Sequence, residues 1–432
     1  MLIDFRFENF RSFKNEQTLS LVAYERLADG LLSHSFETFR KDIPRLLKVA
    51  AIYGANASGK SNLIKALQFM RAMVVNLRFA SASGQIEQPF RLAKESLTKP
   101  TKFEVSLLLN GVRYQYGFST LNEKVTEEYL LAYIKAIPQT WFERIWDERK
   151  GLYRYKYSPS FKGIKNTWEK ATSSNSLYLT TAVSLNCEQL KPIFDWFEKK
   201  LVVINELSPL NEFFTVARTL SRHDSSDVDN LLRAADIGLE RTSVVKKEVS
   251  EKKLHLGAKI ENLRPDEEVR DKYSVFFTHK HGNDFFSLPF EEESFGSQKL
   301  YKLAGPLLDM LDKDVTLAID EMDSSLHPMV LEEILRLFNA RQGPGTSQLI
   351  FTTHCDSLLE NPTSPESIAE PLLRRDQIWF TEKNADLESN LISLQEYKPR
   401  KNESIRDGYR RGRYGGIPLL AISEQPWQPK AN

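Results

Sequence analysis

Residues 46–61 read Leu-Leu-Lys-Val-Ala-Ala-Ile-Tyr-Gly-Ala-Asn-Ala-Ser-Gly-Lys-Ser, and this stretch is the most informative one in the chain. The nearly continuous apolar run from Leu46 to Tyr53 is typical of a short strand that is buried on both faces. From Asn62 to Leu77 the apolar residues recur at helical spacing. A buried strand, a glycine-rich turn and a helix in this order predict an α/β fold.

The turn itself, Gly54 to Ser61, matches the phosphate-loop pattern G-x-x-x-x-G-K-[ST]. Glycines let such a loop curl until its N–H groups point at phosphate oxygens, at the positive end of the helix that follows. Lys60 is expected to reach the β- and γ-phosphates, and the Ser61 hydroxyl is expected to ligate Mg²⁺. The expected cofactors are therefore ATP and Mg²⁺. The predicted nucleotide-binding residues of this motif are Gly54, Asn56, Gly59, Lys60, Ser61 and Asn62.

A second motif supplies carboxylates. Residues 315–321, Val-Thr-Leu-Ala-Ile-Asp-Glu, are a hydrophobic strand that ends in two acidic residues. Asp320 is the predicted second protein ligand of Mg²⁺, and Glu321 is placed to orient or deprotonate an attacking water. Many buried strands end in acidic residues, so this motif alone does not indicate a metal site. Together with the phosphate loop it does.

Length and composition are those of an ordinary globular protein. The 432 residues allow about two to four domains, and 59 Lys+Arg against 58 Asp+Glu exclude a dominantly basic nucleic-acid coat protein. Two Cys exclude a disulfide framework and a Cys-rich zinc site. No apolar stretch approaches the roughly 18–20 residues needed to span a bilayer, and the N-terminus is unlike a signal peptide. We therefore expect a soluble, cytoplasmic protein with no membrane partner.

A third motif lies between these two. Residues 294–298, Ser-Phe-Gly-Ser-Gln, begin 26 residues before Asp320 (320 − 294) and just ahead of a predicted helix. They resemble the signature loop of ABC-type ATPases, although an ordinary helix N-cap at Ser294 or Ser297 explains the same residues. Beyond the two acids, Ser-Ser-Leu-His-Pro at 324–328 resembles the D-loop of that family. Thr-Thr-His at 352–354, at the end of the next predicted strand, resembles its switch histidine.

The five motifs stand in the order typical of ABC/SMC-like ATPases, and the chain is identified as a member of that group. The resemblance implies a dimer in which Ser294 and Gly296 of one copy bind the γ-phosphate held by the other. The catalytic residues that it implies are Glu321, His354 and Lys60. Three residues stay open as the glutamine of the family's Q-loop, namely Gln85, Gln88 and Gln115.

The expected architecture is an α/β, ABC-type (SMC/RecF-like) P-loop ATPase head with a short, mostly helical arm inserted into it. The first lobe, 1–224, holds the phosphate loop. The charge-dense residues 225–282 are the arm, in which no heptad repeat is sustained. The second lobe, 283–375, holds the signature loop, the two acids, the D-loop and the switch histidine. Residues 376–432 are expected to form a basic C-terminal segment.

Two further stretches narrow the resemblance. Asn-Phe-Arg-Ser-Phe at 9–13 and Asp-Glu-Met-Asp-Ser-Ser-Leu-His-Pro at 320–328 resemble bacterial defence ATPases near the overcome-lysogenization (OLD) family. Residues 408–418, Gly-Tyr-Arg-Arg-Gly-Arg-Tyr-Gly-Gly-Ile-Pro, are similar to the C-terminus of ATPase subunits of two-gene abortive-infection systems, the AriA/AbiL/RloA type. The phosphate loop and the signature are 233 residues apart (294 − 61), which is more than a transporter head needs.

This resemblance implies a sensor or scaffold subunit of antiphage defence that binds ATP and hydrolyses it slowly. Its implied partners are further copies of itself, as a dimer or a larger homo-oligomer, a Toprim- or RloB-like effector encoded by a neighbouring gene, and a phage trigger protein. Only 78 residues follow His354 (432 − 354), so we expect the nuclease chemistry to belong to the partner chain. A RecF-like DNA-repair ATPase that binds DNA directly is the alternative. A scaffold in which ATP is purely structural is a third hypothesis.

The C-terminal residues 398–413 hold seven basic side chains against two acidic ones, a net charge of +5 (7 − 2). Tyr409 lies among them, and Tyr397 and Tyr414 flank the segment. Such a segment suits nucleic acid, an acidic partner or an acidic trigger protein. A solvated basic face or ion pairs within the chain is the equally open alternative.

Overall fold

The computed structural model describes a mixed α/β chain with several sheets, which confirms the predicted fold class. The described residues are 1–24, 31–76, 88–134, 137–206, 209–235, 238–247, 273–340, 345–360, 371–400 and 403–417. Within them, no helix combines the length and the apolar character that a bilayer crossing requires.

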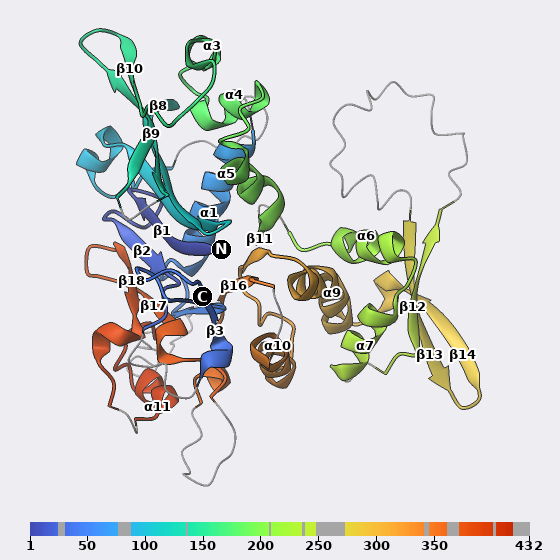
Figure 1. The fold of residues 1–432 in the computed structure, drawn as a ribbon. Coiled ribbons are helices and arrows are strands. Elements are labelled where there is room, and N and C mark those ends of the chain that lie inside the picture. The colour runs from blue at the N-terminus through green and yellow to red at the C-terminus, as the bar shows by residue number, and fades with distance from the viewer. Residues whose placement is uncertain are drawn as a thin grey trace, which may run out of the picture.

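The phosphate-loop strand β5 lies inside a six-stranded sheet with the order β11-β15-β16-β5-β17-β18 (Figure 1). Neighbouring strands are parallel except β17 and β18, which pair antiparallel. All six residues of β5 are buried, and its alternate side chains enter two different apolar cores, as the continuous apolar run predicts. The strands are β5 (Val49–Gly54), β11 (Leu201–Ile204), β15 (Thr316–Ile319), β16 (Gln348–Thr352), β17 (Ile378–Lys383) and β18 (Ser389–Ser393).

A seven-stranded antiparallel sheet packs on one side of this layer, with the order β10-β9-β8-β7-β6-β1-β2. One apolar core joins it to helix α1 (Lys60–Val75) and to Ala50 and Ile52 of β5. Its strands are β1 (Leu2–Glu8), β2 (Gln17–Ser20), β6 (Thr101–Leu109), β7 (Val112–Leu121), β8 (Lys124–Tyr133), β9 (Gln139–Asp147) and β10 (Leu152–Tyr157). The helices α3 (Lys165–Ala171), α4 (Tyr178–Ser184) and α5 (Lys191–Asp195) complete this part.

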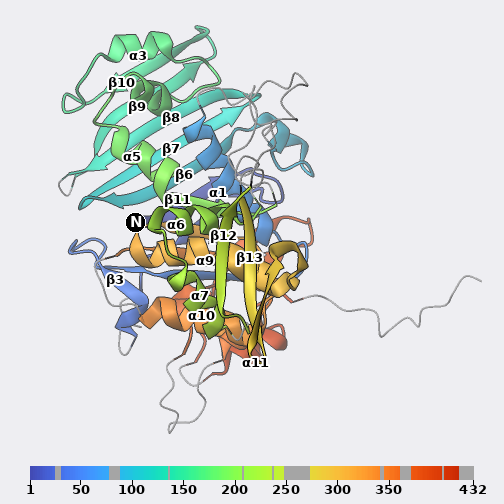
Figure 2. The ribbon, with the colours of Figure 1, turned by 90° about the vertical axis from the view of Figure 1, so that its right-hand side faces the viewer.

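Helices α9 (Phe295–Asp312) and α10 (Pro328–Ala340) contribute to the second core, on the other side of the six-stranded sheet. Helices α6 (Phe213–Arg222) and α7 (Ser226–Ala234) pack against α9. Beyond them lies a three-stranded sheet, β12-β13-β14, so that α9 separates the two sheets (Figures 1 and 2). Its strands are β12 (Arg241–Lys246), β13 (Tyr273–His281) and β14 (Asp284–Pro289).

The inserted arm differs from the mostly helical expectation in its described part. Between 225 and 282 the described residues form one helix, α7, and two strands, β12 and β13. Both strands contain β-branched or aromatic side chains, which favour a pleated surface. The charged runs at 246–253 and 264–272 concealed this pattern, because they dominate the composition of the segment. Residues 236–237 and 248–272 lie outside the described residues.

The C-terminal residues are built into the core of the head. Strand β17 runs parallel to β5, and a short helix, α11 (Ile405–Arg410), follows β18. The ring of Tyr409 lies 5.7 Å from the ring of Tyr53 and 5.5 Å from that of Phe380, measured between centroids. The expected division between 375 and 376 therefore falls inside the six-stranded sheet rather than between two structural units.

Candidate nucleotide site

The phosphate loop takes the shape that its glycines allow. It leaves β5 at Gly54 and enters α1 at Lys60, with positive φ at Ala57 (61°) and Gly59 (120°). A Cβ on Gly59 would lie 2.6 Å from Ser389 Oγ, so both space and backbone conformation require glycine there. The first N–H groups of α1 consequently face the concave side of the loop, where a helix favours an anion.

Lys60 is buried and bonded to its own loop. Its Nζ donates to the carbonyl oxygens of Gly54 (2.7 Å) and Ala55 (3.1 Å). Burial lowers the pKa of Lys60, while Asp320 and Glu321 act in the opposite direction. The ammonium is therefore a desolvated cation held by weak neutral acceptors, which phosphate oxygens would replace with stronger, charge-assisted bonds.

The N-terminal segment supports the loop from one side. Asn62 Nδ2 donates to Ser12 Oγ (2.8 Å), and Ser389 Oγ bonds the same hydroxyl (2.9 Å). The side chain of Asn62, a predicted nucleotide-binding residue, is thus hydrogen-bonded to Ser12 in the segment 9–13. Asn56, at the tip of the loop, is exposed.

The two acids follow β15 directly, and Thr352 at the end of the adjacent strand β16 fixes them. Its Oγ1 donates to Asp320 Oδ1 (2.6 Å) and accepts the backbone N–H of Glu321 (2.7 Å). Glu321 has a positive φ of 50°, which is uncommon for a glutamate, and its side chain is exposed. One hydroxyl therefore holds both Asp320, the half-buried metal-ligand candidate, and the backbone of Glu321, the exposed candidate base.

A third carboxylate, Asp323, enters the site without having been singled out from the sequence. Its Oδ2 accepts the backbone N–H of His354 (3.0 Å), which ties the switch-histidine turn to the turn after β15. Its Oδ1 is buried and has no hydrogen-bond partner in the described part of the chain. Partial burial and the charge of Lys60 lower the pKa of His354, while the carboxylates of Asp323, Glu321 and Asp320 act in the opposite direction. The imidazole is therefore neutral near pH 7 before nucleotide binds.

Helix α9 begins at the signature loop. Ser294 is its N-cap, and its Oγ accepts the backbone N–H of Ser297 (3.1 Å), so the capping interpretation holds within one chain. Ser294 is exposed, and no hydrogen bond among the described residues joins it or Gly296 to the phosphate loop of the same chain. The cap takes up the N–H of Ser297, while the exposed position of Ser294 leaves this turn accessible to a ligand from outside.

Lys299, one turn into α9, joins the signature helix to the acidic turn. Its Nζ donates to the carbonyl oxygens of Glu321 (3.0 Å) and Ser324 (2.5 Å) and to Ser324 Oγ. Burial lowers its pKa. This contact depends on the packing of α9 beside β15, which no local sequence pattern reveals.

These motifs surround a hollow of about 430 Å³. It is lined by residues from four of the five motifs, among them Ser61, Asp320, Glu321, Phe295 and Ser324. The structure thus brings the predicted metal ligands and the predicted base to one place, next to the start of α9.

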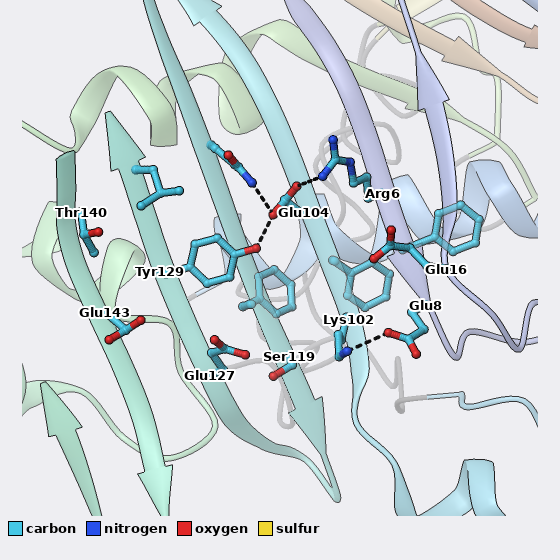
Figure 3. Close-up of a pocket in the computed structure, with 15 residues that line it drawn as sticks. Arg6, Glu8, Glu16, Lys102, Glu104, Ser119, Glu127, Tyr129, Thr140 and Glu143 are labelled. Atoms are coloured by element: carbon cyan, nitrogen blue, oxygen red, sulfur yellow. Dashed lines mark hydrogen bonds and ion pairs between the residues drawn. The ribbon is translucent and has the colours of Figure 1, made fainter. Parts of the chain in front are cut away.

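A second, larger hollow of about 490 Å³ lies on the open face of the seven-stranded sheet (Figure 3). Five glutamates line it, against Arg6 and Lys102. These two cations are already paired, Arg6 with Glu104 and Lys102 with Glu8, and Glu104 also accepts a bond from Tyr129. Such a surface repels a triphosphate and contains no residue of the phosphate loop, so the smaller hollow is the candidate nucleotide site.

The three glutamines proposed for the Q-loop are not brought to this hollow in the described residues. Gln115 lies on β7, where its side chain donates to Glu104 (2.8 Å) and accepts from Tyr133 (2.9 Å). Gln88 bonds Arg11 through its backbone carbonyl (2.7 Å). Gln85 lies outside the described residues.

The C-terminal arginines are largely paired within the chain. Arg406 pairs with Asp356 and Glu360, Arg410 with Asp356, and Arg413 with Glu403. The +5 count of this segment consequently overstates the charge that it offers to a partner.

The family comparison agrees with the geometry. The family model described as "AAA domain, putative AbiEii toxin, Type IV TA system" matches residues 49–178 and 195–360, more than half of the chain. The chain belongs to this AAA-domain family. The phosphate loop and the α/β fold of the chain are those of a P-loop nucleotide-binding domain and agree with this membership. The site residues of this AAA-domain chain lie within the matched ranges, from Gly54 to His354.

Three solved structures are similar to this AAA-domain chain at low identity. An SMC head bound to the C-winged helix domain of ScpA has 14% identity and a TM-score of 0.41, covering 92% of this chain and 99% of that one. An SMC head domain from Thermotoga maritima has 13% identity and a TM-score of 0.37, covering 91% of this chain and 98% of that one. The third structure is an Smc head domain with an extended coiled coil, bound to the C-terminal domain of ScpA derived from Pyrococcus furiosus. It has 13% identity and a TM-score of 0.39, covering 92% of this chain and 97% of that one. A comparison with curated proteins gives no match.

Proposed function

We propose that the chain is an ATP-binding and slowly hydrolysing ABC-type switch, in which two copies close head to head around two ATP molecules. The observation that carries this proposal is the hollow in which Ser61, Asp320 and Glu321 meet beside the start of α9. Ser294 is exposed at the start of that helix and Gly296 is half-buried beside it, and both would contact a nucleotide held by a second copy. Each composite site would then take its phosphate loop, its acids and His354 from one chain and its signature loop from the other.

The donor set fits Mg²⁺. Ser61 Oγ and Asp320 are the oxygen donors that this hard cation prefers, and both line the hollow. When bound, Mg²⁺ would neutralise charge on the β- and γ-phosphate oxygens. Asp323, whose buried Oδ1 has no hydrogen-bond partner among the described residues, is a further carboxylate that acts on Lys60.

The residues of the chain would perform hydrolysis by positioning and by charge. Lys60 would exchange the carbonyls of Gly54 and Ala55 for phosphate oxygens. Glu321, turned outward by its positive φ and held by Thr352, would orient the attacking water and accept its proton. His354, neutral near pH 7, would donate a hydrogen bond toward the γ-phosphate.

The biological role that we propose is that of the ATPase subunit of a two-gene antiphage system. In this role the dimer, or a larger assembly built from it, would hold a Toprim- or RloB-like effector until a phage protein triggers release. Two observations support it, namely the family description, which names a type IV toxin–antitoxin system, and the C-terminal similarity at 408–418. The RecF-like alternative is weakened by the arginine pairs of the C-terminal segment, because paired cations contribute little to phosphate binding.

The proposal is tested by ATP turnover of the purified chain, measured with Mg²⁺ or with EDTA, and with or without duplex DNA at two salt concentrations. We expect slow, Mg²⁺-dependent hydrolysis that DNA does not stimulate. Absence of Mg²⁺-dependent turnover would contradict the ATPase assignment. Salt-sensitive DNA binding that accelerates turnover would instead support the DNA-repair alternative.

The Thr352 hydroxyl offers a further prediction. Thr352→Val keeps the shape of the side chain but removes the bonds to Asp320 and to the Glu321 N–H, so we expect kcat to fall about tenfold or more with ATP affinity nearly unchanged. Thr352→Ser keeps the hydroxyl and is the matched control. Steady-state kinetics and equilibrium ATP binding separate the two effects, and a Val variant with normal kcat would refute this role.

A further inference from the structure

His279, on the middle strand of the three-stranded sheet, joins three segments of the chain. Its Nδ1 lies 2.7 Å from the carbonyl oxygen of Gly238, in the connection between α7 and β12. Its Nε2 lies 2.6 Å from Glu293 Oε1, and only 8% of the Glu293 side chain is exposed. The imidazole therefore connects the three-stranded sheet to the residue directly before Ser294.

The two partners define the charge of this histidine. A carbonyl oxygen and a carboxylate oxygen accept hydrogen bonds, so His279 donates to both partners only in its imidazolium form, with a proton on each ring nitrogen. The bond to Glu293 and then that to Gly238 raise its pKa above the usual 6.5, against the effect of burial. Phe286 lies opposite on β14, and Lys280 points to the other face of the sheet. Glu293 is the charged group that acts on His279 in the described residues.

Glu293 is held from the helix side as well. Gln298 Nε2, in the first turn of α9, donates to the Glu293 carbonyl oxygen (2.9 Å). The segment that enters the signature loop is thus fixed by α9 through its backbone and by the sheet through its carboxylate. Removing His279 would leave the backbone bond but would release the carboxylate from the sheet.

We propose that His279 is a positioning residue for the signature loop, because it holds Ser294 and Gly296 in place through Glu293. A change in the conformation of the three-stranded sheet would then alter the contact of this loop with the nucleotide bound by the other copy. This inference rests on the proposed function, because it assigns the loop to a composite ATP site. It also makes the sheet a place from which a bound partner protein can change ATP turnover.

The pH dependence has a definite sign. The charged form is present below the raised pKa of His279 and is lost as the pH rises through it, and the second hydrogen bond is lost with it. The ratio of wild-type kcat to that of His279→Gln should therefore be about ten at pH 6.5 and shrink toward one at alkaline pH. His281→Gln, the same change two residues along β13 at an exposed position, is the matched control and should leave kcat unchanged at every pH.

The test combines this kinetic profile with amide hydrogen exchange of residues 290–298 in the full-length chain without nucleotide. We expect about tenfold faster exchange in His279→Gln and in Glu293→Gln than in wild type at pH 6.5, and no change in His281→Gln. ATP affinity should be the same in all four proteins, because the phosphate loop lies elsewhere.

Unchanged exchange in His279→Gln would overturn the inference, and so would faster exchange with a normal kcat and a normal pH profile. Absence of ATP turnover in the wild type would refute the proposed function instead. The exchange experiment still decides in that case whether His279 holds the loop, so the two failures are distinguishable.

Discussion

Glu321→Gln is expected to lower ATP turnover by about 100-fold or more while ATP binding persists. Glutamine has the size of glutamate and keeps the backbone N–H bond to Thr352, so the turn after β15 should survive. It cannot accept a proton from water, and the chemical step then lacks its base. ATP-bound dimers should accumulate, visible as a doubled mass in size-exclusion chromatography with light scattering when ATP and Mg²⁺ are present.

Glu333→Gln is the matched control for this variant. Glu333 lies on α10, where it is mostly exposed and forms a long ion pair with Arg336 (3.9 Å), so the same chemical change should leave turnover and mass unchanged. Normal ATPase activity in Glu321→Gln would show that Glu321 is not the base of the reaction. If activity is lost but no ATP-dependent dimers form, Glu321 would still be the base, but the proposed head-to-head dimer around ATP would be refuted.

Lys60→Ala is expected to weaken ATP binding about 100-fold or more. The side chain is the one cation of the phosphate loop, and in a desolvated position it would form charge-assisted bonds to phosphate oxygens. Equilibrium binding of a fluorescent ATP analogue measures this loss directly. Because the hydrogen bonds of Lys60 within the described ranges go to Gly54 and Ala55 of its own loop, the melting temperature should change little.

Lys65→Ala provides the comparison on the same helix. Lys65 is also largely buried, but it pairs with Glu206 and has no bond to the loop. We expect this variant to bind ATP normally. Retained ATP affinity in Lys60→Ala would contradict the phosphate-loop assignment.

The elements that sequence patterns predicted well are those with local causes. The buried strand before Gly54, the glycine turn and helix α1 follow from one continuous stretch, and β15 with Asp320 and Glu321 follows from another. Periodicity and turn chemistry determine such elements without help from distant residues. The order of the motifs then predicted that they would meet, and the structure places Ser61, Asp320 and Glu321 around one hollow.

The remaining features depend on contacts between distant segments. Thr352, Asp323 and Lys299 act through bonds that exist only once β16, the acidic turn and α9 are packed together. Strand β17 pairs with β5, and this choice of neighbour is one that no periodicity encodes. The arm was misjudged for another reason, since long charged runs outweighed the short strand patterns of β12 and β13 in its composition.

The central claim is that each ATP site is completed by a second copy, and mixing two inactive variants tests it most directly. Lys60→Ala disables a phosphate loop, and Ser294→Arg blocks a signature loop, so a mixed dimer retains one intact site only if the two motifs act across the interface. We predict that the mixture regains ATP turnover, whereas a mixture of Lys60→Ala with Glu321→Gln, whose defects lie in the same half-site, stays inactive. No recovery in the first mixture, with both chains folded and dimerising, would contradict the account.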